Sequence, residues 1–461
     1  MNVLLMNPLS RSRELEFAGI GLGYLAAGLR QAGHQPDLLL RQLDNAGFAE
    51  YLARLRPELI GIKILTSNLR DAAATVRLIR GLGPRLVVVG GPHATGDPLR
   101  VLDQTGADFA IRGEADRSFP RLVSLLGRGA PAAEIETIPG LVFRTPDGVR
   151  TNEPEEIRDL DALPMPAWDL MPPGTYLTLV SRAKPAATVL TARGCTNRCS
   201  FCAEAHKRLR FRGIPAVIAE IRYLAETFGV REIQFLDSNF IFMKRYVLEL
   251  CDRIQELPYR LSLCAPNGSR VEAVDDEVCS RLAQSGFYRV NIGIESGSPE
   301  VLKGVCKAAN PDKFRQKVPL FRRHGIQVVG NFMIGFPGET REQMRETLRL
   351  ALELDLSAAN FSIYTPMPGT VLYDRLVHEG RLPADMDFTN FNFVGYENSF
   401  SELTPAQLKR FWSWCVLRFL VRPRTLLTVL ELARSGILFG NLFQRLYWMY
   451  LSKFVPKRTR R

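Results

Sequence analysis

Cysteine is absent from the first 194 residues of this 461-residue chain, and all eight cysteines follow from Cys195 onward. An oxidising compartment favours cysteine pairs spread along a chain, whereas clustered cysteines favour metal binding or catalysis in a reducing one. The N-terminus, MNVLLMNPLSRSRELEF, lacks the basic region, long apolar stretch and cleavage site of a secretory signal. The chain also lacks an uninterrupted apolar run of about 18 residues, so no membrane-spanning helix is expected. We therefore expect a cytoplasmic protein.

Acidic residues are nearly missing from the C-terminal end. From Thr404 onward there are 12 Lys and Arg residues against one acid, Glu431, which is +11 of the total net charge of +12. The basic excess thus belongs to this tail and gives no evidence for a nucleic-acid-binding core. Aromatic and arginine residues interleave in the tail at helical spacing. Three interpretations stay open: a helical cap whose aromatics are core; a surface that contacts anionic lipid or a hydrophobic substrate, making the protein membrane-associated; and a nucleic-acid-binding surface.

The length predicts two or three domains. Residues 1–130 alternate short apolar runs with amphipathic stretches, which predicts a parallel sheet with helices on both faces. Five strands fit the flavodoxin-like doubly wound order. The expected strands are Val3–Met6, Asp37–Leu40, Leu59–Ile64, Leu86–Val89 and Phe109–Ile111.

A second alternating region predicts an open (β/α)6 partial barrel, in which chemistry sits at the carboxyl ends of the strands. Its expected strands are Ala187–Thr191, Glu232–Leu236, Leu261–Ala265, Arg289–Ile294, Val328–Ile334 and Ala359–Tyr364. We therefore divide this α/β chain into a Rossmann-like domain (1–135), a hairpin and linker (136–180), the partial barrel (181–375) and a helical, basic and aromatic C-terminal region (376–461).

The strongest motif is TVLTARGCTNRCSFCAEAH, in which Cys195, Cys199 and Cys202 have the spacing Cys-x3-Cys-x2-Cys just past a strand end. Three thiolates on one short loop can hold three irons of a 4Fe–4S cluster and leave the fourth iron open to a substrate. A zinc site is the alternative, because His206 is near enough in sequence to complete it.

This cysteine loop resembles the hallmark of the radical S-adenosylmethionine superfamily. The resemblance implies that S-adenosylmethionine binds the open iron and is cleaved reductively to a 5′-deoxyadenosyl radical. Phe201 matches the apolar position that touches adenine, and GIESGS supplies Glu295 and Ser296 as contacts to the methionine or ribose part. NFMIGFPGET, with Gly335, resembles the adenine-binding segment of the fifth strand, while FLDSNF and YTPMPGT end the second and sixth strands.

The N-terminal domain resembles the cobalamin-binding domain of B12-dependent radical enzymes, because GYLAAGLRQAGH, PELIGIKILTSN, VVVGGPHAT and AIRGEAD fall at the matching places. No histidine lies in the Asp-x-His-x-x-Gly pattern that supplies a cobalt ligand elsewhere, so the resemblance implies cobalamin bound base-off without a protein histidine. We expect the loop around Thr66, Ser67 and Asn68 to cover its lower face. His93 has two interpretations, a hydrogen bond to the backbone or contact with the corrin. The further candidate cobalamin residues are Asn7, Gly90, Gly91, Gly113 and Glu114.

The resemblance as a whole implies methylation of an unactivated carbon in a small molecule, such as a lipid- or pigment-like metabolite. It also implies an external flavodoxin- or ferredoxin-like electron donor. Because the basic excess is confined to the tail, we expect no nucleic-acid partner. Three alternatives stay open: a ring contraction, oxidation or cyclisation with the same cofactors; a radical enzyme whose N-terminal domain is degenerate and binds no cobalamin; and an RNA-modifying methylthiotransferase. The last group carries three further N-terminal cysteines and a C-terminal β-barrel, neither of which is found here.

Overall fold

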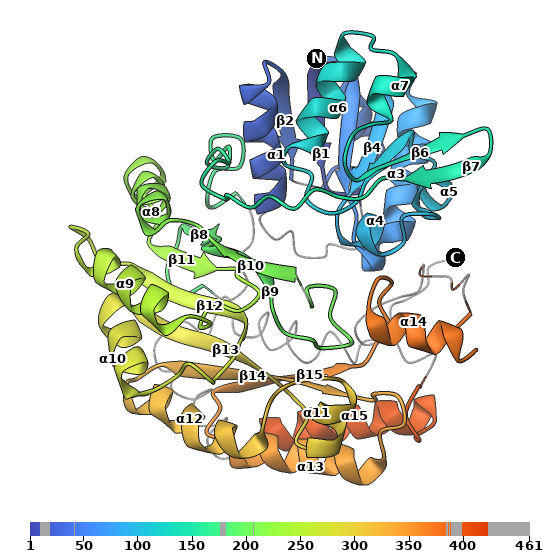
Figure 1. Cartoon of the computed structure of the whole chain (residues 1–461). Coiled ribbons are helices and arrows are strands. Elements are labelled where there is room, and N and C mark those ends of the chain that lie inside the picture. Colours follow the sequence, from blue (N-terminus) through green and yellow to red (C-terminus); the bar gives the residue numbers. More distant parts are fainter. Residues whose placement is uncertain are drawn as a thin grey trace.

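Two mainly parallel sheets, one in each half of the chain, organise the protein (Figure 1). The computed structural model describes residues 1–9, 19–40, 42–175, 181–205, 207–383, 386, 388 and 399–422. Helices flank each sheet, and the carboxyl ends of the first sheet's strands point toward the second domain (Figure 1). Within the described residues, no helix is both long and apolar enough to cross a membrane.

The first sheet has the order β2-β1-β3-β4-β5-β6-β7, so its five parallel strands confirm the predicted flavodoxin-like order. Its strands are β1 (Asn2–Met6), β2 (Gln35–Leu39), β3 (Leu59–Lys63), β4 (Leu86–Gly90), β5 (Phe109–Ile111), β6 (Leu141–Thr145) and β7 (Gly148–Thr151). The hairpin β6–β7 is where the sequence predicts it, but it extends this sheet by pairing antiparallel with β5. Gly61 in β3 is required by packing, because a Cβ atom there would lie 2.7 Å from Leu5 and 3.1 Å from Phe119.

Among the described residues, seven α-helices and one 3-10 helix accompany the first sheet. They are α1 (Ile20–Gln31), α2 (Asn45–Leu55), η1 (Thr66–Asn68), α3 (Leu69–Gly81), α4 (Pro92–Gly96), α5 (Val101–Thr105), α6 (Ser118–Gly127) and α7 (Ala132–Ile135). The short helices α4 and α5 follow β4 where the sequence shows no apolar period, since five residues are too few to display one.

The second sheet has six parallel strands in the order β15-β14-β13-β12-β11-β8, which confirms the predicted (β/α)6 arrangement. The strands are β8 (Ala186–Val189), β11 (Glu232–Phe235), β12 (Ser262–Ser269), β13 (Phe287–Glu295), β14 (Gln327–Ile334) and β15 (Ala358–Ile363). The helices are α8 (Ile214–Phe228), α9 (Lys244–Gln255), α10 (Asp276–Ser285), α11 (Pro299–Gly304), α12 (Pro311–Arg323), α13 (Arg341–Glu353), α14 (Val371–His378) and α15 (Pro405–Leu420). Stacked rings of Phe235, Phe240 and Phe287, with centroids 4.8–5.6 Å apart, fill part of its core.

The described part of the C-terminal region is helical and caps the second sheet. In α15, Phe411, Trp412 and Phe419 are buried, and the indole N–H of Trp412 donates to the carbonyl of Phe361 in β15 at 2.9 Å. This agrees with the cap interpretation for α15. The rest of the basic, aromatic tail, residues 423–461, lies outside the described residues.

Candidate functional site

A two-stranded ribbon that the sequence did not predict carries the cysteine loop. Its strands, β9 (Ala192–Cys195) and β10 (Lys207–Phe211), pair antiparallel and lie between the two large sheets (Figure 1). Gly194 makes this pairing feasible, because its φ of +89° is left-handed and a Cβ atom would lie 2.1 Å from the carbonyl oxygen of Arg208. Cys195 therefore ends a strand, and Cys199 and Cys202 follow in the next turn.

The three thiols lie in a largely desolvated loop. Cys195 and Cys199 are buried and Cys202 is half-buried. Burial raises the pKa of the Cys199 thiol to about 11, although the nearby positive charge of Lys307 acts against it. The side-chain amide of Asn197 donates to Sγ of Cys195 at 3.1 Å, a contact that favours the thiolate. Two buried thiols and one half-buried thiol, with one such donor, match the ligand set of an iron–sulfur cluster, whose ligands must be deprotonated when the metal binds.

The described side chains do not support the binding of a single metal ion, such as zinc, at this loop. Among the described residues, no group of three His, Cys, Asp or Glu side chains is arranged to hold one metal ion. A cubane cluster differs, because each cysteine binds a separate iron and the sulfurs need not converge. His206, the further ligand considered for zinc, lies outside the described residues.

Asp237, at the carboxyl end of β11, fixes the segment that leads into the ribbon. Its Oδ1 atom accepts hydrogen bonds from the backbone N–H groups of Thr191 and Ala192 and from the Thr191 hydroxyl. Burial raises the pKa of Asp237 to about 6, against the lowering effect of these hydrogen bonds. Its Oδ2 atom has no partner within the described structure. The FLDSNF motif thus acts, through Asp237, on the segment that leads into the ribbon and its cysteine loop.

Glu295, predicted to contact S-adenosylmethionine, lies beside the cysteine loop. It ends β13 with a φ of +65° and forms a 3.1 Å ion pair with Lys307, whose charge also reaches Cys199. Ser296, in contrast, is fully buried: its hydroxyl bonds with the Thr347 hydroxyl at 3.0 Å and accepts from the N–H of Ser298. The side chain of Ser296 therefore stabilises the turn between β13 and α11.

Phe201 and Gly335 also come together. The ring of Phe201 packs against that of Phe336, with centroids 5.4 Å apart. The N–H groups of Gly335 and Phe336 donate to Oε2 of Glu339, whose Oε1 atom has no partner within the described structure. Burial raises the pKa of Glu339 to about 8 despite these two hydrogen bonds. The structure therefore brings Phe201, the glutamate-capped turn at Gly335 and the cysteine loop to the same end of the sheet.

A cavity of about 590 Å³ opens between the carboxyl ends of the first sheet and the ribbon. Four of the candidate cobalamin residues line it: Gly90, Gly91, Gly113 and Glu114. Its opposite wall comes from the second domain: Leu190, Ala192, Arg193, Gly194, Ala203, Glu204, Lys207, Arg210, Leu236, Ser238, Pro368 and Gly369. The strand ends of one wall present backbone and small residues to this space, so the cavity fits a flat ligand such as a corrin lying against the first sheet.

Five other candidate cobalamin residues do not line this cavity: Asn7, Thr66, Ser67, Asn68 and His93. His93 is fully buried, with Nδ1 3.2 Å from the Thr66 hydroxyl and Nε2 3.0 Å from Oε1 of Gln104. Burial lowers the pKa of His93, so the ring is neutral at physiological pH. Asn68 accepts a hydrogen bond from the N–H of Leu65, which shapes the start of η1. The residues that follow β3 thus build a loop outside the lining of this cavity, and the ring nitrogens of His93 form hydrogen bonds with side chains and not with the backbone. Contact of His93 with the corrin, and cover of the lower face by the Thr66–Asn68 loop, stay predictions.

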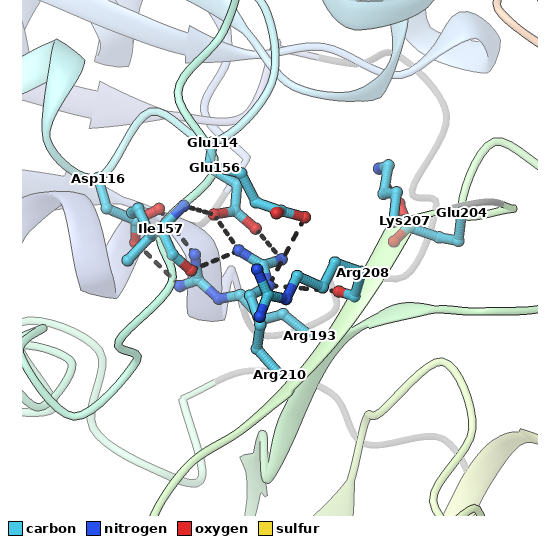
Figure 2. A network of polar contacts seen from close by, with 9 residues as sticks. All are labelled: Glu114, Asp116, Glu156, Ile157, Arg193, Glu204, Lys207, Arg208 and Arg210. Carbon is cyan, nitrogen blue, oxygen red and sulfur yellow. Dashed lines mark hydrogen bonds and ion pairs between the residues drawn. The ribbon is translucent and has the colours of Figure 1, made fainter.

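Charged residues at the cavity wall join the two domains (Figure 2). Arg193 of β9 donates two hydrogen bonds to Asp116, at 2.8 and 2.9 Å, and Arg210 of β10 donates two to Glu114, at 2.9 and 2.7 Å. Burial acts to raise the pKa of Glu114, but its hydrogen bond to Arg210 and the neighbouring charges lower it overall. Of these four residues, only Glu114 is a candidate from the sequence alone, because no local pattern reveals partners 77 and 96 positions apart.

Comparisons with known proteins agree with both halves of the site. Residues 6–123 match the B12 binding domain, and residues 189–351 match the Radical SAM superfamily. An uncharacterised methyltransferase of Pyrococcus horikoshii is 30% identical over 440 residues, which is 93% of this chain and 94% of that protein. The anaerobic magnesium-protoporphyrin IX monomethyl ester cyclase of Rubrivivax gelatinosus is 26% identical over 86% of this chain and 73% of its own length.

The fold also matches a solved structure. The radical S-adenosylmethionine methyltransferase TsrM from Kitasatospora setae, with cobalamin and a [4Fe-4S] cluster bound, superposes with a TM-score of 0.69 at 22% identity. The match covers 89% of this chain and 81% of that one. The shared fold thus includes the cobalamin domain, the radical domain and their arrangement.

Proposed function

Since this chain belongs to the family of B12-dependent radical S-adenosylmethionine enzymes, with a 4Fe–4S cluster, S-adenosylmethionine and cobalamin as cofactors, we propose that it methylates an unactivated carbon of a hydrophobic small molecule. One observation carries this proposal: a single cavity is walled on one side by the strand ends of the B12-binding domain and on the other by the ribbon that ends in Cys195. Hydrogen abstraction and methyl delivery must reach one substrate carbon, so both cofactors have to face a common space.

When bound, the cluster with S-adenosylmethionine supplies hydrogen-atom abstraction, and cobalamin supplies the methyl group. The protein's part is to hold, orient and exclude water. Cys195, Cys199 and Cys202 would each hold one iron, and Asp237 fixes the backbone that leads to them. On the other wall, Gly90, Gly91 and Gly113 would admit the corrin against the strand ends.

The lining of the cavity supports a hydrophobic substrate. Its second-domain wall includes apolar surface at Leu190, Leu236 and Pro368, between the charged residues of the ribbon and the first sheet. A lipid- or pigment-like molecule would bury such surface, and burial of apolar area is the general driving force for binding in pockets of this kind.

A second candidate is a reaction that uses the same cofactors without net methylation. The similarity to the cyclase of Rubrivivax gelatinosus, over 86% of this chain, supports this second candidate. The mass of the product separates the two, because methyl transfer adds one methylene unit and cyclisation or oxidation does not.

The test uses the full chain, reconstituted anaerobically with iron, sulfide and cobalamin and given S-adenosylmethionine labelled with deuterium in its methyl group. We expect label to appear in a component of a lipid and pigment extract, as a gain of one labelled methyl. A product without label, formed together with 5′-deoxyadenosine, would overturn methyl transfer in favour of the second candidate. Protein without added cobalamin is the control, and it should transfer no label.

A further inference from the structure

Two arginines face each other across the β9–β10 ribbon. Arg193 and Arg210 are direct partners in the antiparallel pairing, and like charges in such a position destabilise a ribbon. Each arginine instead meets a carboxylate from the loop after β5, Arg193 with Asp116 and Arg210 with Glu114 (Figure 2). Glu156 makes a longer ion pair with Arg210, at 3.8 Å. The first domain therefore neutralises a charge conflict inside the ribbon that ends in Cys195. We call the Arg193–Asp116 and Arg210–Glu114 ion pairs the clamp.

The clamp is largely buried, and it is less exposed than most ion pairs among the described residues. The side chains of Arg193 and Asp116 are 17% and 10% exposed, and those of Arg210 and Glu114 are 5% and 23% exposed. Removing one partner of a buried pair leaves an uncompensated charge out of water, which is far more disruptive than breaking a surface pair. The clamp therefore resists separation of the two domains at this point.

Further contacts hold the clamp in one geometry. The guanidinium of Arg193 lies over the ring of Tyr24 from α1, 5.0 Å from its centroid. The backbone of Ile157 contacts both members of the Arg210–Glu114 pair. Its carbonyl accepts a hydrogen bond from Arg210 at 2.5 Å, and its N–H donates one to Glu114 at 3.0 Å. Each arginine thus has a bidentate ion pair and at least one further contact, so its side chain has little rotational freedom.

The position of the clamp gives it a role in the proposed reaction. All four of its residues line the cavity, and Arg193 is only two residues before Cys195. We propose that the Arg193–Asp116 and Arg210–Glu114 pairs are positioning contacts that set the separation between the cobalamin on the first sheet and the cluster on the ribbon. This inference rests on the proposed function only for the identity of the two groups that are positioned.

The first test needs no cofactor. In the cofactor-free full chain, Asp116→Asn keeps the size of the side chain but leaves Arg193 without its charge partner. We expect backbone amides of the ribbon to exchange with deuterium roughly tenfold faster or more, because a buried charge has lost its partner. Asp169→Asn is the matched control, since Asp169 also pairs bidentately with an arginine, Arg30, but that pair is about half exposed and lies outside the cavity lining. Unchanged ribbon exchange in Asp116→Asn would overturn the clamp.

The second test measures the separation directly. Pulsed EPR of the reconstituted chain gives the distance distribution between cob(II)alamin and the reduced cluster. We expect one narrow distribution in the wild type and in Asp169→Asn, and a broader or shifted one in Asp116→Asn and in Glu114→Gln. If both clamp variants gave a distribution as narrow as that of the wild type and at the same distance, the positioning role would be overturned, even if hydrogen exchange in the ribbon had become faster. A wild type that binds no cobalamin would overturn the proposed function instead, and the exchange experiment would still decide the clamp.

Discussion

Oδ1 of Asp237 accepts hydrogen bonds from the backbone N–H and the hydroxyl of Thr191, at 2.8 and 3.0 Å, four residues before the first cysteine of the cluster loop. The contact ties the end of β11 to the entrance of the ribbon. It also explains why an aspartate is buried there with a raised pKa, since its hydrogen bonds only partly offset the cost of burial.

Replacing Asp237 with alanine should therefore weaken the cysteine loop. The variant leaves the N–H groups of Thr191 and Ala192 without an acceptor, which costs about 1–3 kcal/mol of folding free energy and lowers cluster retention. Iron content per chain after anaerobic reconstitution and desalting is the measurement. Asp44→Ala is the matched control, because Asp44 also accepts a backbone hydrogen bond, at the start of α2, far from the cysteines. Equal iron retention in both variants would show that Asp237 does not support the loop.

Glu339 should make stability depend on pH. Burial raises its pKa to about 8 in the folded chain from an ordinary value of 4.5, so the folded state keeps a proton that the unfolded chain releases. The stabilising contribution is complete below pH about 4.5 and is lost as the pH rises through about 8. We expect the melting temperature of the wild type to fall between about pH 6 and pH 9 more steeply than that of Glu339→Gln, which carries no charge at any pH. Parallel pH profiles for the two proteins would contradict the assignment.

His93 should matter for the fold of the first domain and not for cobalamin affinity. His93→Ala removes the partner of the Thr66 hydroxyl and of Gln104, so we expect a loss of about 1–3 kcal/mol in urea unfolding. Titration with cobalamin, followed by absorbance, should give an unchanged dissociation constant. Weakened cobalamin binding with unchanged stability would instead restore the interpretation that His93 contacts the corrin.

The exposed apolar residues at the C-terminal end of α15 allow a test of membrane contact. Trp414, Leu417 and Val421 are 43%, 56% and 53% exposed and follow one another at intervals of three and four residues. With the basic charge of the tail, this stripe should bind anionic vesicles, and salt should weaken the binding because the Debye length shortens.

Flotation with phosphatidylglycerol vesicles, compared with phosphatidylcholine vesicles, is the measurement. The double variant Trp414→Ala, Leu417→Ala should bind less than the wild type. Tyr223→Ala is the control, since it removes a side chain that is 37% exposed on α8. No salt-sensitive binding of the wild type to anionic vesicles would rule out the membrane interpretation.

The sheet orders could be predicted because buried parallel strands read as short apolar runs, such as LVVVG in β4 and FYRVNIGIE in β13. The cysteine spacing identified its loop because those three residues are close in sequence. The β9–β10 ribbon could not be predicted, since ARGC and KRLRF have neither apolar alternation nor a turn signal. The roles of His93 and the clamp depend on side chains brought together from distant positions, which no local pattern encodes.

Cluster binding by the three cysteines is the central claim, and one measurement tests it most directly. The wild type, Cys199→Ala and Cys279→Ala are reconstituted anaerobically with iron and sulfide, and cluster absorbance and reductive cleavage of S-adenosylmethionine are recorded. Cys279 is a matched control because it is buried in α10, outside the cysteine loop. We expect the wild type and Cys279→Ala to take up one cluster and form 5′-deoxyadenosine, and Cys199→Ala to do neither. Unchanged cluster absorbance in Cys199→Ala would contradict the assignment.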